Sequence, residues 1–386
     1  MRIGIDARFY GIIGKGLGRY TQKLIENLEK ISAKGGDFAD EYFIFLGKEN
    51  FYDYEPKNSN FHKILAPYRW YTLREQIGMP IILNKYKLDL VHFPHFNVPF
   101  LYRKKFVVTI HDLILLQFPT VKNTTLNPLF YKMKFLAYKL IIWSAIGRAQ
   151  KVITVSNFTK KELLKYYKKS LKEERIAITY EAGNDNEETG KFDSQNDLEV
   201  LKNYGILKPY LLYVGNAYPH KNLERLVLAF GALNIAQKYQ LVLVGKTDYF
   251  YSALKKMIQE KDIQDVIFLE QISDEILDII YRKSKAFVFA SLYEGFGIPP
   301  LEAMSRKLPV ISSDHPCMKE ILEDSAYFFD GQDENSIMES MKKILENEEM
   351  RQDLIEKGLQ QIKKYSWGKM AKETKKIYSE INEEKK

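Results

Sequence analysis

The chain of 386 residues has 45% hydrophobic and 28% charged side chains and a formal net charge of +8. These are ordinary values for a globular protein of about two domains. A single cysteine, Cys317, excludes a disulfide framework and a cysteine-rich zinc module. No apolar run reaches the ~18 residues of a membrane-spanning helix, and the N-terminus is charged again at Asp6, so we expect no signal peptide and a cytoplasmic protein.

Short apolar runs alternate with helical patterns along the first half of the chain. Runs rich in β-branched residues and ended by polar residues or glycine are typical of strands. Between them we expect helices such as Gly18–Ile31 and Leu126–Arg148. The expected strands are Arg2–Asp6, Tyr42–Leu46, Leu90–Phe93, Phe106–Ile110, Lys151–Val155 and Ile176–Thr179.

The second half repeats this alternation, with helices such as Leu223–Ala236 and Ser252–Lys261. Its strands are nearly continuous apolar runs, which is typical of strands buried on both faces of a parallel sheet. Alternating strands and helices imply right-handed crossovers, so we predict an α/β protein of two Rossmann-like domains. The expected strands are Tyr210–Val214, Gln240–Val244, Val266–Leu269, Ala286–Ala290, Pro309–Ser312 and Ala326–Phe329.

A polar and acidic segment, Glu181–Glu199, separates the two series and predicts a linker. We therefore place the N-terminal domain at residues 1–185 and the C-terminal domain at 205–368. The tail is highly charged and has a helical pattern. We expect residues 369–386 to form a helix that packs back on the N-terminal domain.

The charge is uneven along the chain. Residues 1–180 hold 30 Lys and Arg against 15 Asp and Glu, whereas residues 181–386 hold 28 against 35. The densest basic stretch, 122–175, is interleaved with aromatic residues. Solvated helix faces would explain it, but so would attraction to an anionic membrane surface. No nucleic-acid-binding motif is present, so we expect no nucleic acid partner.

Ligands of open parallel sheets bind where strands end, so the residues after each strand are candidates. A glycine-rich segment, Gly11–Tyr20, follows the first strand and suits a phosphate or diphosphate near a helix N-terminus; a plain flexible turn is the alternative. Another strand ends in His111 and Asp112, which suit substrate hydroxyls unless the histidine is structural. His92 and His95 flank a further strand end, and a structural role is favoured for both.

In the second half, the strand Tyr210–Val214 runs into a glycine turn followed by Lys221, just before a helix. A lysine there can neutralise a phosphate as a compact point charge, although a surface lysine is the alternative. Glu294 and Glu302 lie eight residues apart across a Gly-Phe-Gly turn and a Pro-Pro pair. Because Pro300 suits the first turn of a helix, both carboxylates can face one crevice. Buried there, they would need hydroxyl or cationic partners, and a sugar with a ribose supplies hydroxyls.

The segment from Glu294 to Glu302 resembles the E-x7-E motif of retaining GT-B glycosyltransferases of the family 4 type, which use nucleotide-sugar donors. The resemblance covers nearly the whole chain and implies two Rossmann-like domains facing across a cleft. Four further segments resemble motifs of this family: Gly14–Tyr20, Thr109–Leu113, Val152–Ser156 and Val214–Leu223.

The resemblance assigns roles to these residues. Glu302 would bind the donor ribose, Glu294 would contact the transferred sugar, and Lys221 would neutralise the diphosphate. His111 would hydrogen-bond the sugar, and Gly16 would cover the diphosphate from the N-terminal domain. The remaining donor-side residues would be Gly215, Asn216, Phe296, Gly297 and Ile298, and the acceptor-side residues would be Gly14, Arg19 and Asp112. One departure is Asn216, where many members carry arginine, so the cationic clamp depends on Lys221 with help from His220 or Arg225.

The reaction implied is transfer of mannose or a similar hexose, with retained configuration, to a glycan or lipid-linked acceptor in polysaccharide synthesis. No Asp-x-Asp motif is present, so we expect neither a metal nor another cofactor. Two alternatives remain: a sugar-nucleotide epimerase of the same fold, which would act without acceptor, and a non-catalytic sugar-nucleotide-binding protein, which would bind donor without turnover.

Overall fold

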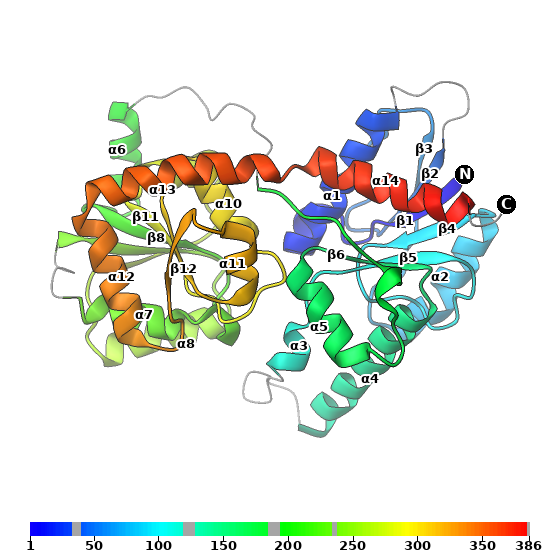
Figure 1. Ribbon diagram of the computed structural model, residues 1–386, viewed down its shortest axis with the longest axis horizontal. Coiled ribbons are helices and arrows are strands. Elements are labelled where there is room, and N and C mark those ends of the chain that lie inside the picture. The colour runs from blue at the N-terminus through cyan, green and yellow to red at the C-terminus, as the bar shows by residue number, and fades with distance from the viewer. Residues whose placement is uncertain (33–39, 119–127, 184–193, 234–237, 384–386) are drawn as a thin grey trace. The chain divides into compact units, whose positions relative to one another are not determined.

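A computed structural model describes residues 1–32, 40–118, 128–183, 194–233 and 238–383 (Figure 1). The chain forms two compact units. Unit 1 comprises Met1–Glu181 together with Trp367–Lys386, and unit 2 comprises Ala182–Ser366. The chain therefore passes between the units twice, once after Glu181 and once after Ser366.

Unit 1 contains a seven-stranded parallel sheet in the order β3-β2-β1-β4-β5-β6-β7. Its strands are β1 (Arg2–Asp6), β2 (Glu41–Leu46), β3 (Phe61–Leu65), β4 (Leu90–Phe93), β5 (Phe106–Ile110), β6 (Lys151–Thr154) and β7 (Ile176–Ile178). Its helices are α1 (Lys15–Ser32), α2 (Leu73–Lys85), α3 (Ile114–Gln117), α4 (Pro128–Arg148), α5 (Asn157–Tyr167) and α14 (Trp367–Glu383). The five inner strands β2, β1, β4, β5 and β6 are almost wholly buried, as their apolar sequences require.

Unit 2 contains a six-stranded parallel sheet in the order β10-β9-β8-β11-β12-β13. Its strands are β8 (Tyr210–Val214), β9 (Gln240–Val244), β10 (Val266–Leu269), β11 (Ala286–Phe289), β12 (Val310–Ser313) and β13 (Ala326–Phe329). Its helices are α6 (Ser194–Asn203), α7 (Leu223–Gly231), α8 (Tyr249–Glu260), α9 (Asp274–Lys283), α10 (Ile298–Ser305), α11 (Pro316–Leu322), α12 (Glu334–Glu346) and α13 (Glu348–Gln361).

Both sheets reverse their strand order at one point. In unit 1 the reversal falls between β1 and β4, and in unit 2 between β8 and β11. The loops after these strands leave in opposite directions and open a crevice at the carboxyl edge of the sheet. The predicted α/β class with two Rossmann-like domains is confirmed. Lys221 and Glu294 follow the two strands at the unit 2 reversal and the glycine-rich loop follows β1, whereas His111 follows β5, the strand next to β4.

The structure adds one strand that the sequence pattern did not indicate. β3 is an edge strand whose central residues, His62 and Lys63, are polar and half-buried, so it lacks the apolar run that identified the other strands. The charged tail is two helices, α13 and α14, joined through residues 362–366. Most of the linker expected at Glu181–Glu199 lies outside the described residues, although its end forms the start of α6.

Helix α14 completes unit 1 by packing against α1 (Figure 1). A buried chain of hydrogen bonds fixes it to the sheet. The Tyr378 hydroxyl lies 2.6 Å from His92 Nδ1, and His92 Nε2 lies 2.8 Å from Thr109 Oγ1. Burial lowers the pKa of His92 to about 3, so its imidazole is neutral and serves as a structural link between α14 and strands β4 and β5.

We predict that Tyr378→Phe lowers the free energy of unfolding of unit 1 by about 1–3 kcal/mol, because it leaves a buried ring nitrogen of His92 without its partner. Urea denaturation measures the change. Tyr52→Phe is the matched control, since Tyr52 is 84% exposed, and it is expected to change stability by less than about 0.5 kcal/mol. Equal stability of the two variants would contradict this role of Tyr378.

Candidate active site

The strand reversal of unit 2 brings together a lysine and a glutamate that are far apart in sequence. Lys221 ends a short 3-10 turn after β8 (Pro219–Lys221), and Glu294 lies in the loop after β11. Lys221 Nζ lies 2.5 Å from Glu294 Oε1. Both side chains are largely buried, with 15% and 10% of their surfaces exposed. Two sequence-predicted site residues therefore form one ion pair at the carboxyl edge of the sheet.

The pair keeps Glu294 ionised in a buried position. Burial pushes the pKa of this carboxyl upward, but the charge of Lys221 and its hydrogen bond to Glu294 hold it below its ordinary value. His220 behaves differently: burial and the charge of Lys221 lower its pKa to about 4. Because His220 is neutral at pH 7, it adds no positive charge beside Lys221.

Two neighbouring residues expected on the donor side are used to build the turn. The Asn216 carbonyl accepts a 2.8 Å hydrogen bond from the Tyr213 hydroxyl, and its side-chain oxygen accepts one from the Tyr218 amide. The Gly215 carbonyl accepts a 2.9 Å bond from the Tyr251 hydroxyl. Arg225, the other cation considered, donates to the side chain of Asn222. Lys221 is therefore the cation that the structure pairs with Glu294.

Helix α10 begins four residues after Glu294. Gly297 precedes the helix with φ of 94°, and a Cβ there would lie 2.6 Å from Met318 Cε, so glycine is required. Gly297 is the N-cap, and Pro299 and Pro300 have no N–H. The amides of Gly297 and Ile298 are therefore the ones that the helix cannot satisfy internally. The Phe296 ring instead packs edge-on against Tyr365 in the interior, which leaves only its backbone for a ligand.

Glu302 lies within α10, as expected, and is half-buried. Its carboxylate accepts a long, 3.5 Å hydrogen bond from the Tyr281 hydroxyl. A cavity of about 560 Å³ opens at the same edge of the sheet, after β11, β12 and β13. It is lined by Ser291, Leu292, Ser313, Asp314, His315, Pro316, Lys319, Asp330, Gly331 and Gln332.

The glycine-rich loop of unit 1 lies at the other strand reversal. A Cβ on Gly14 would lie 2.1 Å from the Phe9 carbonyl oxygen, and one on Gly18 would lie 2.0 Å from that of Gly11. These two glycines are therefore needed for tight packing of the loop. Gly16 is exposed and has no atom near its Cβ position, so its backbone is open to a ligand. Arg19 follows on α1 and is half-buried.

His111 follows β5, and both of its ring nitrogens have partners. Nε2 lies 2.9 Å from the Pro94 carbonyl oxygen, and Nδ1 lies 2.9 Å from Glu181 Oε1. Burial alone lowers the pKa of His111, but these bonds and the charge of Glu181 raise it above its ordinary value. Sequence reasoning placed Glu181 in a linker and so did not anticipate this pair. Asp112 accepts a 2.9 Å bond from the Ile114 amide, which starts α3.

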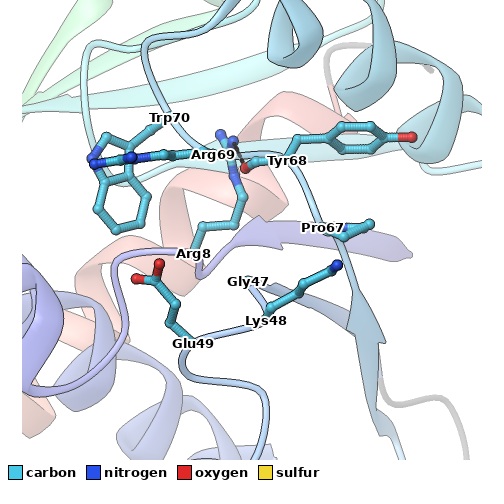
Figure 2. A pocket seen from close by; sticks show the side chains of 8 residues that line it. All are labelled: Arg8, Gly47, Lys48, Glu49, Pro67, Tyr68, Arg69 and Trp70. Carbon is cyan, nitrogen blue, oxygen red and sulfur yellow. Dashed lines mark hydrogen bonds between the residues drawn. The ribbon is translucent and has the colours of Figure 1, made fainter.

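Sequence reasoning also missed a second cavity, in unit 1. It has a volume of about 110 Å³ and lies after β1, β2 and β3 (Figure 2). Its lining residues are Arg8, Gly47, Lys48, Glu49, Pro67, Tyr68, Arg69 and Trp70. The one available signal was the dense aromatic and basic run Tyr68–Tyr71, but without β3 it had no place at a strand end.

Within the described ranges, no three His, Cys, Asp or Glu side chains are placed to hold a metal ion. Over the same ranges, no helix combines the length and apolar character needed to cross a bilayer.

Comparison with known proteins identifies the family. The profile described as "Glycosyltransferase Family 4" matches residues 16–182, and the one described as "Glycosyl transferases group 1" matches residues 202–361. The chain belongs to the group 1 glycosyltransferases of the GT-B fold. The family 4 match in this glycosyltransferase includes Gly16 and His111. The group 1 match includes Lys221, Glu294 and Glu302.

Two relatives extend over almost all of this glycosyltransferase. It is 27% identical over 374 residues to the O-antigen chain mannosyltransferase RfbU of Salmonella typhimurium, covering 93% of this chain and 94% of the relative. It is 26% identical over 390 residues to the O-antigen chain mannosyltransferase B of Escherichia coli, covering 94% and 95%.

Solved structures share the fold. The sucrose-phosphate synthase of Thermosynechococcus elongatus superimposes with a TM-score of 0.75 at 18% identity, covering 99% of both chains. HepE of Anabaena, solved in complex with UDP and glucose, superimposes with a TM-score of 0.74 at 14% identity, covering 98% of this chain and 100% of HepE.

We predict that Glu181→Gln removes a pH-dependent part of the stability of this glycosyltransferase. Because the folded-state pKa of His111 lies above its ordinary 6.5, the ion pair contributes fully below about pH 6.5, and its contribution is lost as the pH rises through the folded pKa. Urea denaturation at pH 6 should show a loss of about 1–3 kcal/mol that shrinks at higher pH.

Glu41→Gln serves as the control for this experiment, since it removes a carboxylate that lies 3.9 Å from the half-buried His62 and 2.6 Å from Arg2, whose charge does not change over this pH range. We expect that substitution to produce a much smaller pH-dependent difference. A loss for Glu181→Gln that stays constant from pH 6 to 9 would contradict the charge assigned to His111.

Proposed function

We propose that this glycosyltransferase moves mannose or a similar hexose from a nucleoside-diphosphate donor to a glycan or lipid-linked acceptor during cell-surface polysaccharide synthesis, with retention of configuration. Two full-length relatives named as O-antigen mannosyltransferases support the sugar and the pathway. HepE, a solved structure of the same fold, was obtained with UDP and glucose bound, which supports a nucleotide-sugar donor.

The observation that carries the proposal is the buried Lys221–Glu294 ion pair at the reversal of the unit 2 sheet. The leaving nucleoside diphosphate gains negative charge as its bond to the sugar breaks. A lysine held in a largely buried site stabilises that charge better than one in water, because the surroundings screen it less. We infer that Lys221 contacts the diphosphate and that Glu294 accepts hydrogen bonds from the transferred sugar. Glu294 is ionised for this role, because its pKa lies below the ordinary value of a glutamate.

The residues around this pair fit the rest of a sugar nucleotide. Glu302, which is half-buried and accepts a long bond from the Tyr281 hydroxyl, is assigned to the two ribose hydroxyls. The backbone amides of Gly297 and Ile298 are assigned to the sugar. The adjoining cavity of about 560 Å³ has room for a hexose ring. Gly16 in unit 1 is assigned to the diphosphate.

The proposed chemistry needs no protein nucleophile and no metal. The acceptor hydroxyl attacks the anomeric carbon from the face that the diphosphate leaves, and a departing phosphate oxygen takes the hydroxyl proton. The charge of Glu294 is engaged with Lys221, which suits a hydrogen-bonding role rather than covalent attack. His111 is assigned to a sugar hydroxyl, which must share or displace one of its two ring partners. Gly14, Arg19 and Asp112 are assigned to the acceptor side.

We predict that Glu294→Gln lowers kcat by roughly 100- to 1000-fold, because it removes both the acceptor of sugar hydrogen bonds and the partner that orients Lys221. The assay measures release of nucleoside diphosphate from a panel of sugar nucleotides, with EDTA present, with and without acceptor. Glu339→Gln is the control, since Glu339 is exposed on α12, and it should retain full activity. Unchanged turnover by Glu294→Gln, or equal release without acceptor, would refute the proposed function.

We also propose that unit 1 binds the anionic inner surface of a membrane. Four apolar side chains of α4 that follow one helix face, at spacings of three and four residues, are 52–61% exposed: Met133, Leu136, Leu140 and Trp143. Exposed lysines at positions 132, 134 and 139 accompany them. This combination is the one by which helices lie in a bilayer interface. Residues 122–127 of the stretch named from sequence lie outside the described part of the chain.

We predict that replacing Lys132, Lys134 and Lys139 by Gln weakens binding to anionic vesicles roughly a hundredfold, since each lysine near such a surface contributes about 1 kcal/mol. Sedimentation with vesicles containing phosphatidylglycerol measures the change, and added salt should release the wild type. The matched control replaces three exposed lysines of unit 2, Lys202, Lys256 and Lys261, and should bind normally. Equal binding by the two variants would exclude α4 as the contact.

A further inference from the structure

The proposed donor chemistry leaves the smaller cavity in unit 1 without a role. This cavity lies at the carboxyl ends of β1, β2 and β3, at the edge of the sheet where ligands of such sheets bind. Figure 2 shows the side chains of Lys48, Glu49 and Trp70 around it. Its rim therefore combines an aromatic ring with side chains of both charges.

Aromatic rings extend from the cavity along the sheet edge. The Trp70 ring stacks on Phe9 with centroids 4.6 Å apart, and Phe9 in turn contacts the His95 ring at 5.2 Å. The Tyr71 ring lies edge-on to the His95 ring, with the two centroids 6.1 Å apart. We call these four residues, Phe9, Trp70, Tyr71 and His95, the aromatic ledge. Burial and the charge of His111 lower the pKa of His95 to about 3, so the whole ledge is uncharged at pH 7.

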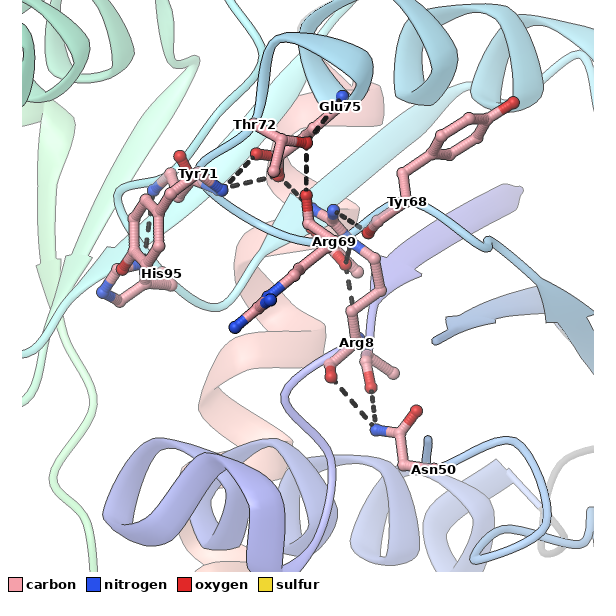
Figure 3. Close-up of polar contacts among 11 residues, drawn as sticks. Arg8, Asn50, Tyr68, Arg69, Tyr71, Thr72, Glu75 and His95 are labelled. Atoms are coloured by element: carbon pink, nitrogen blue, oxygen red, sulfur yellow. Dashed lines mark hydrogen bonds and ion pairs between the residues drawn. The ribbon is translucent and has the colours of Figure 1, made fainter. Parts of the chain in front are cut away.

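A buried ion network holds the loop that carries Trp70 and Tyr71. Arg8 is only 1% exposed, and its guanidinium lies 2.6 Å from both Asp6 Oδ2 and Glu75 Oε1. It also donates to the Tyr68 carbonyl oxygen at 2.9 Å (Figure 3). Because Arg8 is fully engaged by these partners, it holds the loop and is not itself a ligand-binding cation.

The network also holds Tyr71 in an unfavourable backbone conformation. Tyr71 has φ of 62°, in the left-handed region that bulky residues rarely occupy. Its amide donates a 2.7 Å bond to Glu75 Oε2, the carboxylate whose other oxygen binds Arg8 (Figure 3). The Tyr71 side chain remains 55% exposed. A strained backbone that is held by a buried network and presents a large aromatic residue to solvent is typical of ligand sites.

We propose that the aromatic ledge and its cavity bind a sugar ring of the acceptor glycan. The apolar face of a hexose carries C–H groups that pack on aromatic rings, and its hydroxyls hydrogen-bond to charged side chains at the edge. Lys48, Glu49 and Arg69 are exposed at the rim and supply donors and an acceptor. This mixture suits a polyhydroxylated ligand, because each hydroxyl can donate to the carboxylate of Glu49 and accept from Lys48 or Arg69. The assignment rests on the proposed function.

The test compares Trp70→Ala with Tyr52→Ala, a matched loss of an exposed aromatic ring in the same unit. For Trp70→Ala we expect kcat/KM for the acceptor to fall at least tenfold through a higher KM, while the thermal shift caused by the donor stays unchanged. Trp70→Phe, which keeps a ring on Phe9, should recover most of the activity and also shows that the fold is intact. An unchanged KM in Trp70→Ala would overturn the proposal.

A binding measurement separates failure of this inference from failure of the proposed function. Saturation-transfer NMR with mannotriose should show contact with the wild type and with Glu294→Gln, and a weaker contact with Trp70→Ala. Equal signals for the wild type and Trp70→Ala would refute the ledge, whatever the donor turns out to be. Chemical-shift changes at the Trp70 indole with inorganic phosphate but not with mannotriose would show an anion site instead, which would also refute it.

Discussion

The ion pair between Lys221 and Glu294 is the interaction around which unit 2 is organised. The two residues are far apart in sequence, but β8 and β11 are neighbouring parallel strands, so the residues that follow them lie at the same carboxyl edge of the sheet. A buried carboxylate without a partner would be costly, and the charge of Lys221 is what keeps Glu294 ionised. Glu294 in turn fixes the position of the Lys221 ammonium group, which is proposed to contact the diphosphate. Gly297 at the N-cap of α10 then contributes an amide that the helix itself does not satisfy, in the same loop as Glu294.

Much of this arrangement could be predicted from the sequence, because strands buried on both faces leave continuous apolar runs and the E-x7-E segment is specific. β3 was missed because an edge strand has polar residues on its exposed side. The pairing of His111 with Glu181 was missed because it depends on where the chain leaves β7, which no local pattern fixes. The role of Tyr68–Tyr71 was missed because it depends on Arg8, some 60 residues earlier.

The two units differ in charge as well as in their proposed ligands. The lysines of α4 and the exposed apolar residues among them lie in unit 1, the unit to which the acceptor is assigned. A lipid-linked acceptor is confined to a membrane, whereas a sugar nucleotide is free in solution. A basic unit for the acceptor and a more acidic unit for the donor would match the places where these two substrates are found.

The bonding of α14 to unit 1 affects how the protein is made. Residues 367–383 complete the fold that begins at Met1, yet they are synthesised after the whole of unit 2. Until they leave the ribosome, α1 lacks its neighbour and His92 lacks the Tyr378 hydroxyl. The first unit to be translated is thus the last to be finished, and the nascent chain carries an apolar surface that chaperones would have reason to cover.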